Sequence, residues 1–384
     1  MAERTLHTIL DGFQKVELQD LGNILGNHLN ARLRKSQLVD QLHTYLRGEP
    51  RRWMSHLLER DVRLLREMVQ AGPEKVRYQE FADYPSLLEV SGLLQSDDSD
   101  EHFHKVWITR EVYDIVALEI DDVIHSCEQN GQFEVERMML GYLNLYGIVP
   151  TEQFISMLAE WYEKACGGDF YKLSHIMHQS PLLKMYRYID SRGDYVCTPC
   201  MDWADVDEVF YLRKEFRQKQ FKPFSYEQVR EAGTGAPYFN LGMKTPDGMR
   251  VEQMFRHLGY SGLELVTVLH DTWIEAQHTA DVNHRLLDPL YDSPRRVLDD
   301  ASFNECIHIV LDYANSLPKW VLNGYSSSET GLCLQEGSAY DDASRPAEEG
   351  KYAFGLAVPH VAPDDPCPCG SGLRYCRCHG KYMS

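Results

Sequence analysis

The sequence lacks the long apolar run that a membrane-spanning helix needs. None of its apolar stretches approaches the roughly 18 residues required to cross a bilayer. The first twenty residues also lack the basic start and apolar middle of a secretory signal peptide, because acidic residues are scattered through them. These absences predict a cytoplasmic protein with no membrane insertion.

Cysteine is scarce outside the end of the chain. Of ten cysteines in 384 residues, six are scattered before residue 340, a distribution that suggests no disulfide framework. The other four lie between residues 367 and 378, where metal binding is the expected use. The sequence also lacks a Walker-type glycine loop, a Gly-x-Ser-x-Gly elbow and a His-Glu-x-x-His helix, so we expect no enzyme built on any of these motifs.

The sequence has fewer basic than acidic residues. With 39 Lys and Arg against 58 Asp and Glu, the formal charge is −19, which opposes non-specific attraction to nucleic-acid phosphates over most of the surface. Residues 1 to 66 are the exception, since they hold eleven basic against eight acidic residues. Any contact with nucleic acid is therefore expected first in this region.

The remaining composition is that of an ordinary globular protein, with 43% hydrophobic and 25% charged residues. Apolar residues recur at helical spacing through most of the chain, and its length exceeds what one core usually fills. We predict a mainly α, multi-domain protein with winged-helix-like units and a small C-terminal zinc knob.

Residues 1 to 48 are predicted to form a small helical module. Two helices are expected between Val16 and Leu46, with the basic residues Arg32, Arg34 and Lys35 at the start of the second and Ser36 as its cap. The pattern resembles the helical modules at the start of the transcription terminator Rho and in SAP-type domains, which implies a nucleic-acid contact. The alternative is a helical hairpin that packs on the rest of the protein.

Residues 49 to 127 and 128 to 202 each suggest a winged-helix-like unit. In the first, helices at ERDVRLLREMVQAG and YPSLLEVSGLL precede a strand that leads into a third helix. In the second, three helices precede the hairpin MYRYIDSRGDYVCTP, which is expected to turn at Ser191 to Gly193. Its third helix carries a single lysine, Lys172, which favours a structural or protein-binding role over DNA recognition.

The last three segments differ in character. Residues 203 to 322 are predicted to form an α-helical domain, because five stretches show helical periodicity. Residues 323 to 363 are rich in Ser, Gly and acids, which predicts a flexible acidic linker. Residues 364 to 384 contain the cysteine cluster.

The cluster reads CPCGSGLRYCRCHG. Two potential ligand pairs, Cys367 with Cys369 and Cys378 with His379, are separated by a Gly-Ser-Gly turn, so each pair can approach one ion from opposite sides. Three thiolates and one imidazole match tetrahedral structural zinc, whereas the histidine and the tight spacing disfavour an iron–sulfur cluster. A segment this short cannot bury enough apolar surface to fold alone, so Zn²⁺ would supply most of its folding free energy.

The same residues resemble the SEC-C motif at the C-terminus of the bacterial translocation motor SecA. The resemblance implies that Cys367, Cys369, Cys378 and His379 bind zinc and that Arg374, Tyr375, Arg377 and Lys381 form a partner-binding surface. It further implies docking onto a protein or ribonucleoprotein, such as the SecB chaperone or the ribosome. Cys376 stands where the family usually has a basic residue, so a register that uses Cys376 as a ligand remains an alternative.

Two other groups of residues are weaker candidates. Cys197 and Cys200 have redox or zinc-knuckle spacing but no matching second pair, which favours structural cysteines. A pattern of a metal-dependent phosphohydrolase is resembled by the residues His270, Asp271, His278, Asp281 and His284. If these residues lie on one continuous helix, their spacing favours a solvated or interface face of that helix over a catalytic site. We therefore expect a non-enzymatic zinc-binding adaptor, with a nucleic-acid-associated regulator as the alternative.

Overall fold

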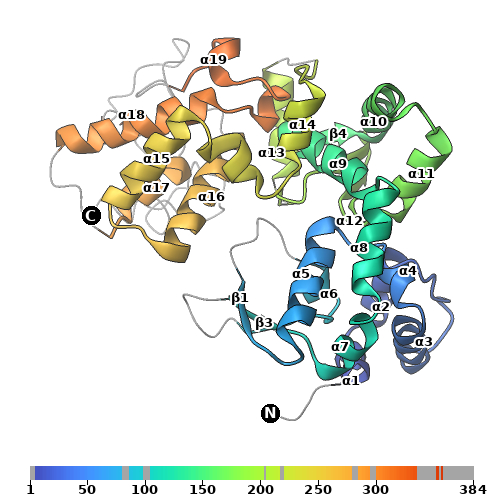
Figure 1. Ribbon diagram of the computed structural model, residues 1–384. Helices are drawn as coiled ribbons and strands as arrows, with labels where there is room; N and C mark the ends of the chain where they lie inside the picture. The colour runs from blue at the N-terminus through green and yellow to red at the C-terminus, as the bar shows by residue number, and fades with distance from the viewer. Residues whose placement is uncertain are drawn as a thin grey trace. The chain divides into compact units, whose positions relative to one another are not determined.

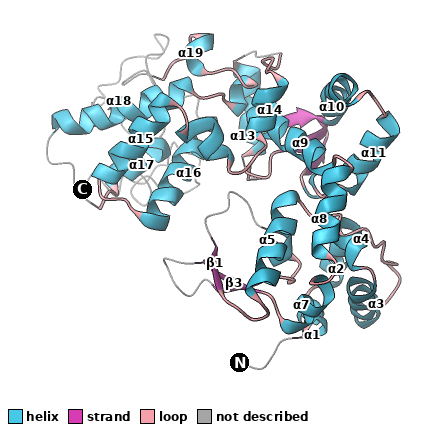
Figure 2. Cartoon of the chain, in the orientation of Figure 1, coloured by secondary structure: helices cyan, strands magenta, loops and turns pink. Residues whose placement is uncertain are grey.

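The computed structural model describes residues 5–79, 86–97, 104–202, 205–216, 220–278, 284–294 and 300–334, together with two short strands near residue 355. The described part is mainly α, with small antiparallel sheets (Figures 1 and 2). This confirms the predicted fold class at the level of secondary structure. None of the helices in the described ranges has the length and apolarity needed to span a bilayer.

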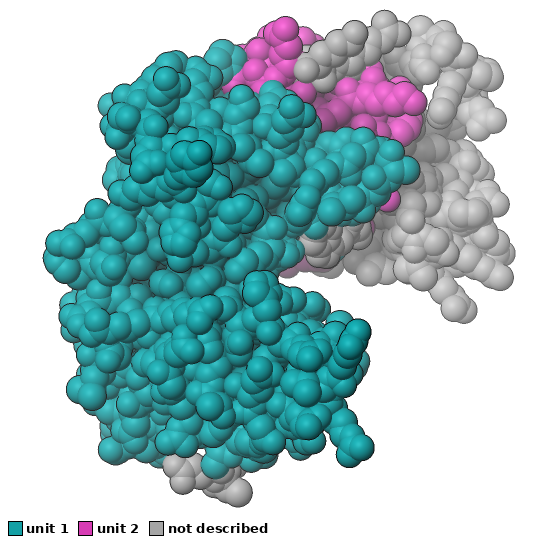
Figure 3. All heavy atoms as spheres, turned by 90° about the vertical axis from the view of Figure 1, so that its right-hand side faces the viewer, with its two compact units in different colours: residues 1–202, 223–237 teal, residues 203–222, 238–384 magenta. Residues whose placement is uncertain are grey.

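Contacts divide the chain into two compact units (Figure 3). The first contains Met1–Asp202 and Pro223–Pro237, and the second contains Trp203–Lys222 and Tyr238–Ser384. A stretch of the segment predicted as one α-helical domain, residues 203 to 322, thus packs with the first unit. The finer domain boundaries remain predictions.

The first unit contains most of the short helices. Its helices are α1 Leu6–Gly12, α2 Lys15–Ile24, α3 Lys35–Gly48, α4 Pro50–Met54, α5 Glu59–Ala71, α6 Leu87–Val90, α7 Arg110–Val116, α8 Ile120–Gln129, α9 Gln132–Tyr146, α10 Thr151–Cys166, α11 Phe170–Gln179, α12 Leu182–Met185 and α14 Tyr226–Ala232. The two helices expected between residues 16 and 46 correspond to α2 and α3. Their apolar faces, including Leu18 and Leu42, are buried in a common core.

Two three-stranded antiparallel sheets in this unit share one topology. In the first, β1 Arg77–Gln79 and β2 Gln95–Asp97 flank β3 His104–Trp107. In the second, β4 Ile148–Pro150 and β5 Arg187–Asp190 flank β6 Gly193–Cys197. In both sheets the third strand in chain order lies in the middle. The predicted hairpin corresponds to β5 and β6, with its turn at residues 191 and 192.

Helix α9 and the C-terminal end of α14 approach each other closely because glycines lie at the contact, Gly141 within α9 and Gly233 directly after α14. A Cβ atom added to Gly141 would lie 1.8 Å from the Val229 carbonyl oxygen, and one added to Gly233 would lie 1.8 Å from the Arg137 carbonyl oxygen. Only glycine permits this backbone separation. The side chain of Asn144 adds a hydrogen bond to the Ala232 carbonyl at 2.9 Å, so α14 is held on α9 by both packing and polar contacts.

The second unit is also helical. It contains α13 Val206–Glu215, the π-helix η1 Tyr238–Met243, α15 Pro246–His257, α16 Gly262–His278, α17 His284–Tyr291, α18 Asp300–Ser316, the 3₁₀ helix η2 Trp320–Leu322, α19 Ser327–Thr330, and the paired strands β7 Tyr352–Ala353 and β8 Leu356–Ala357. Its centre includes Trp273, Tyr313 and Trp320, all fully buried, and the two indole rings meet edge to face with centroids 5.6 Å apart.

Several local expectations differ from the structure. Helix α3 begins at Lys35 with Arg34 as its N-cap, so Ser36 lies inside the first turn and is not the cap. The helix expected around residues 84 to 94 spans only Leu87–Val90, because the chain soon enters β2. The helix expected after β3 is two helices, α7 and α8.

The start of the predicted linker is packed. Within residues 323 to 334, Leu334 is buried, and its backbone exchanges two hydrogen bonds with the side chain of Asn315 at 2.7 and 2.8 Å. Helix α19 is joined to residue 222 by an ion pair between Lys222 and Glu329 at 2.5 Å. The loss of helical periodicity after Leu322 therefore marks irregular but packed structure as far as residue 334, and not a linker from its first residue.

Candidate functional sites

The predicted metal site lies in the tail. Its proposed ligands Cys367, Cys369, Cys378 and His379, the alternative ligand Cys376, and the proposed partner-binding residues Arg374, Tyr375, Arg377 and Lys381 all lie outside the described residues. Among the residues that the structure does describe, no three or more His, Cys, Asp or Glu side chains are grouped so that they could hold a metal ion. The zinc prediction therefore depends on the sequence pattern of the tail.

The basic residues predicted to contact nucleic acid lie at the start of α3. Arg32, Arg34 and Lys35 are all exposed. The Lys35 ammonium donates a hydrogen bond of 2.5 Å to the Asp11 carbonyl and lies 4.0 Å from the Asp11 carboxylate. The backbone amide of Arg34 donates a hydrogen bond of 3.0 Å to the side chain of Gln37. The Arg34 guanidinium makes no capping hydrogen bond to the helix. Lys35 thus joins α3 to α1, while the two arginines present charge to solvent.

The histidine run at residues 270 to 284 does not lie wholly on a solvated face. His270, Asp271 and His278 belong to α16, His284 is the first residue of α17, and Asp281 lies outside the described residues. The imidazole of His278 is only 6% exposed, with its Nδ1 3.6 Å from Asp205 and its ring 5.2 Å from that of Trp320. Burial lowers the pKa of His278, and the Asp205 carboxylate opposes this shift. His278 is therefore an interior residue, because the helix turns this face toward the core.

The second weak candidate, Cys197 and Cys200, lies in the turn that follows β6. Cys197 is buried and Cys200 is half-buried. Between them, the Thr198 hydroxyl donates to Asn144 at 2.8 Å, and its amide donates to the Gly147 carbonyl at 2.6 Å. These bonds hold the turn against α9, as expected for a structural position, and the structural reading of the two thiols stays a prediction.

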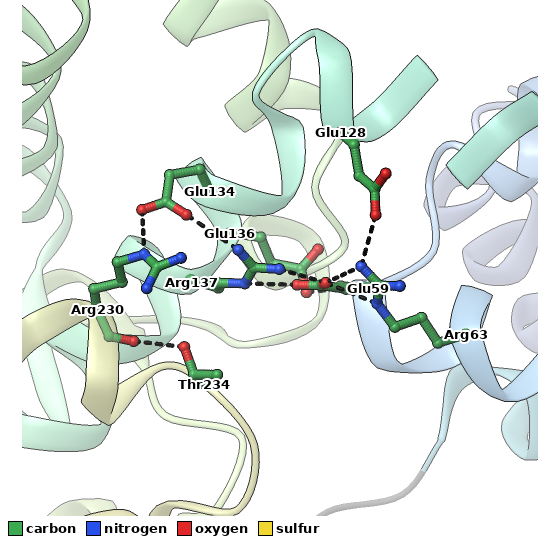
Figure 4. A network of polar contacts seen from close by, with 8 residues as sticks. All are labelled: Glu59, Arg63, Glu128, Glu134, Glu136, Arg137, Arg230 and Thr234. Carbon is green, nitrogen blue, oxygen red and sulfur yellow. Dashed lines mark hydrogen bonds and ion pairs between the residues drawn. The ribbon is translucent and has the colours of Figure 1, made fainter. Parts of the chain in front are cut away.

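A partly buried polar network in the first unit has no counterpart among the sequence-based predictions (Figure 4). Glu59, at the start of α5, accepts two hydrogen bonds from Arg137 of α9 at 2.5 and 2.8 Å. Its carboxylate also pairs with Arg63, which reaches Glu128 of α8 at 2.9 Å. Glu59 is 14% exposed and Arg137 21% exposed, so solvent screens this network only in part.

The network extends from α9 to α14. Glu134 accepts from Arg137 at 3.1 Å and from Arg230 of α14 at 2.6 Å, as Figure 4 shows. The Arg230 carbonyl in turn accepts a hydrogen bond from the Thr234 hydroxyl at 2.7 Å. The network therefore links four helices, α5, α8, α9 and α14, whose members lie as far apart in the sequence as Glu59 and Arg230, a separation that no local pattern could reveal.

Glu136 has the most perturbed carboxyl group of this network. Its side chain is 6% exposed and accepts a hydrogen bond of 2.8 Å from the Glu59 amide, at the N-terminus of α5. Burial raises the pKa of Glu136 to about 8; the nearby Glu59 and Asp61 carboxylates add to this shift, while the amide bond and Arg137 oppose it. At neutral pH this group is therefore largely protonated, and its role is to cap a helix inside the core.

No protein-family model matches the chain, and no solved structure matches it. A short segment is similar to the protein translocase subunit SecA. It is 62% identical over 29 residues to SecA of a Polaromonas species and 67% identical over 27 residues to SecA of Paraburkholderia phymatum. These segments cover 8% and 7% of this chain and 3% of each SecA, so the similarity extends to a short stretch and not to the translocase as a whole.

Proposed function

We propose that the SecA-like segment is the cysteine-rich tail, residues 364 to 384, and that this tail is a SEC-C zinc-binding motif. The observation that carries the proposal is the identity of 62% or more to SecA over 27 to 29 residues. The tail is where the sequence resembles SecA, and its three thiols and one imidazole suit tetrahedral zinc.

Cys367, Cys369, Cys378 and His379 would hold the ion. With four protein ligands no coordination position is left for water or substrate, so the zinc would stabilise the tail and not catalyse a reaction. The chain would then act as a non-enzymatic adaptor. Its folded helical units would carry the tail, and the surface formed by Arg374, Tyr375, Arg377 and Lys381 would bind a protein or ribonucleoprotein partner.

The ligand set can be tested by measuring the zinc content of the purified full chain by mass spectrometry. We expect about one equivalent in the wild type and in Cys376→Ser, and a large loss in Cys378→Ser. Loss of zinc in Cys376→Ser, with zinc retained in Cys378→Ser, would support the alternative register. A metal-free wild type purified without chelators would overturn the proposal.

Partner docking can be tested with purified SecB and purified ribosomes. We expect one of these two partners to bind the zinc-loaded wild type. The double variant Arg374→Glu, Lys381→Glu should bind that partner at least tenfold more weakly, and Cys378→Ser should not bind it. The charge-reversal variant keeps all four ligands, so it separates loss of the surface from loss of the metal. Equal binding by all three proteins would contradict docking through the tail.

A second candidate function is nucleic-acid association through the helical module. The observation that favours it is that the guanidinium groups of Arg32 and Arg34 are exposed and form no ion pair within the described ranges. The shared strand order of the two sheets also supports the interpretation of residues 49 to 127 and 128 to 202 as winged-helix-like units. Binding to DNA or RNA that falls steeply with salt and weakens in Arg34→Glu would support this function.

A further inference from the structure

A pocket of about 450 Å³ opens between α4, α8 and α11 in the first unit. Its walls differ in chemistry. Helix α4 contributes Arg51 and Arg52, whereas α11 contributes Lys172, His175 and Gln179. The lining also includes the apolar side chains of Val123 and Ile176, and the end of α8 adds the polar side chains of Ser126 and Asn130. Basic residues from both α4 and α11 thus line a space large enough for a small ligand or part of a polymer.

The arginines of the α4 wall are held in place by hydrogen bonds. Arg51 pairs with Glu119 and donates to Asp122 at 2.6 Å. Arg52 donates to Glu49 at 2.9 Å and to the Gly26 carbonyl at 3.2 Å. Asp122 is the one carboxylate in the lining, and it is already engaged by Arg51.

The α11 wall carries charge that has no such partner. Lys172 is exposed, and its ammonium forms no ion pair in the described part of the chain. His175 contacts Gln179 through an N–N hydrogen bond of 3.1 Å. Burial lowers the pKa of the nearby His56, and a hydrogen bond to the Arg52 carbonyl opposes this shift. The positive charges of Lys184, Arg52 and His175 lower the pKa further. These contributions agree with a locally positive region on an acidic protein.

Two aromatic side chains lie immediately before Lys172. Phe170 is 55% exposed, and Tyr171 is 89% exposed. Other aromatics of this unit, such as Phe154 and Trp161, are buried. Exposed aromatic rings therefore occur on the same helical turn as an exposed cation, although neither ring lines the pocket itself. Rings on which bases stack, combined with a charge that contacts the backbone phosphate, are typical of single-stranded nucleic-acid binding.

We propose that the pocket between α4, α8 and α11, together with Tyr171, binds a phosphate and an adjacent base of single-stranded nucleic acid. This site is independent of the zinc tail. It places nucleic-acid contact on α11, whereas the second candidate function above places it on α3, so the two are separable by mutation.

The test measures binding of a fluorescently labelled oligothymidylate of about twelve nucleotides to the full chain by anisotropy at low salt. Lys172→Glu and Tyr171→Ala are each expected to weaken binding about tenfold or more. Lys75→Glu is the matched control, because Lys75 is exposed, lies outside the pocket lining and undergoes the same change of charge. It is expected to change binding less than about twofold. Lys172→Gln is expected to reduce the slope of log affinity against log salt by about 0.7.

Four results would overturn the proposal. The first is no binding by the wild type at low salt. The second is equal weakening in Lys172→Glu and Lys75→Glu, which would indicate a diffuse electrostatic effect. The third is loss of binding in Arg34→Glu with full binding in Lys172→Glu and Tyr171→Ala, which would place the contact on α3. Duplex DNA that binds as tightly as the single strand, with no effect of Tyr171→Ala, would likewise exclude base stacking at this site.

Discussion

The interiors of the two units differ in their buried ionisable groups. In the described part of the first unit these groups are mainly acids: Glu136 and Asp61 are 6% and 1% exposed, arginines lie nearby, and His56 is a buried base. In the second unit they are bases: Lys319 is fully buried, and His278 lies against Trp320. Burial favours the neutral form in each case, so it raises the pKa of the acids and lowers the pKa of the bases.

The pKa shifts have opposite consequences for stability. Burial raises the pKa of Glu136 to about 8, so the folded first unit binds more protons than the unfolded chain between about pH 4.5 and 8, and it loses stability as the pH rises through this window. Burial lowers the pKa of Lys319 to about 7, with a small opposing effect from Cys333. The folded second unit therefore binds fewer protons between about pH 7 and 10.5, and it gains stability as the pH rises.

The largest expected effect comes from breaking the network of the first unit. Glu59→Ala leaves Arg137 and Arg63 without their shared carboxylate, and we expect a loss of about 3 kcal/mol in the free energy of unfolding, because partly buried charges lose their partner. The matched control Glu160→Ala removes an exposed ion pair with Lys164 and should cost about 0.5 kcal/mol or less. Chemical denaturation measures both. Similar losses in the two variants would show that burial adds nothing to the network.

The second prediction concerns Lys319. Between pH 7 and 9 the wild-type second unit should gain about 2 kcal/mol of stability, since one proton fewer is bound in the folded state. Lys319→Met should abolish this gain, whereas Lys214→Met, at an exposed position of α13, should retain it. Hydrogen exchange of peptides from α16 and α18, corrected for intrinsic rates, reports on this unit. A pH dependence unchanged in Lys319→Met would be incompatible with a depressed pKa.

In the first unit the wild type should show the reverse pH dependence, and Glu136→Gln should remove it. The amide keeps an oxygen acceptor for the Glu59 backbone N–H but cannot ionise. Between pH 6 and 7.5 we expect the wild type to lose about 1 to 2 kcal/mol relative to the variant. The readout is hydrogen exchange in peptides from α5 and α9. If wild type and variant differ by the same amount at pH 5 and at pH 7.5, the raised pKa of Glu136 is wrong.

The smallest effect is expected at the exposed end of the network. Arg230 is 52% exposed, and within the described ranges Glu134 is the one carboxylate with which it forms an ion pair. Arg230→Gln should therefore cost about 0.5 kcal/mol, and high salt should remove most of the difference. Thermal melting at two salt concentrations measures this. A loss as large as that of Glu59→Ala would mean that the network acts as one cooperative unit.

Much of the secondary structure was predictable from apolar periodicity. The helices around residues 16 to 46, α5, α9, α10, α11 and the β5–β6 hairpin all follow patterns readable in the sequence. Most of these helices have one buried face, whereas α9 is buried on nearly every side. Helix α6 was predicted too long, and residues 323 to 334 were predicted to be mobile. In both places the structure depends on packing against distant residues, such as Asn315 against Leu334.

The candidate sites divide in the same way. The cysteine cluster was recognisable because all its proposed ligands lie within thirteen consecutive positions, so spacing alone carries the information. The Glu59 network and the pocket beside Lys172 were not recognisable, because their members come from helices far apart in the chain. His278 was expected on a solvated or interface face, and its burial against Trp320 depends on η2, 42 residues later.

The sequence alone determined the properties that depend on neighbouring residues: a mainly helical chain, an acidic surface charge and a terminal group of thiols suited to zinc. The tertiary structure decided which ionisable groups are removed from water and which of them meet. The physical reason is that hydrogen-bonded turns and ligand spacing act over a few residues, whereas desolvation and ion pairing depend on distances in space that close only when the chain has folded.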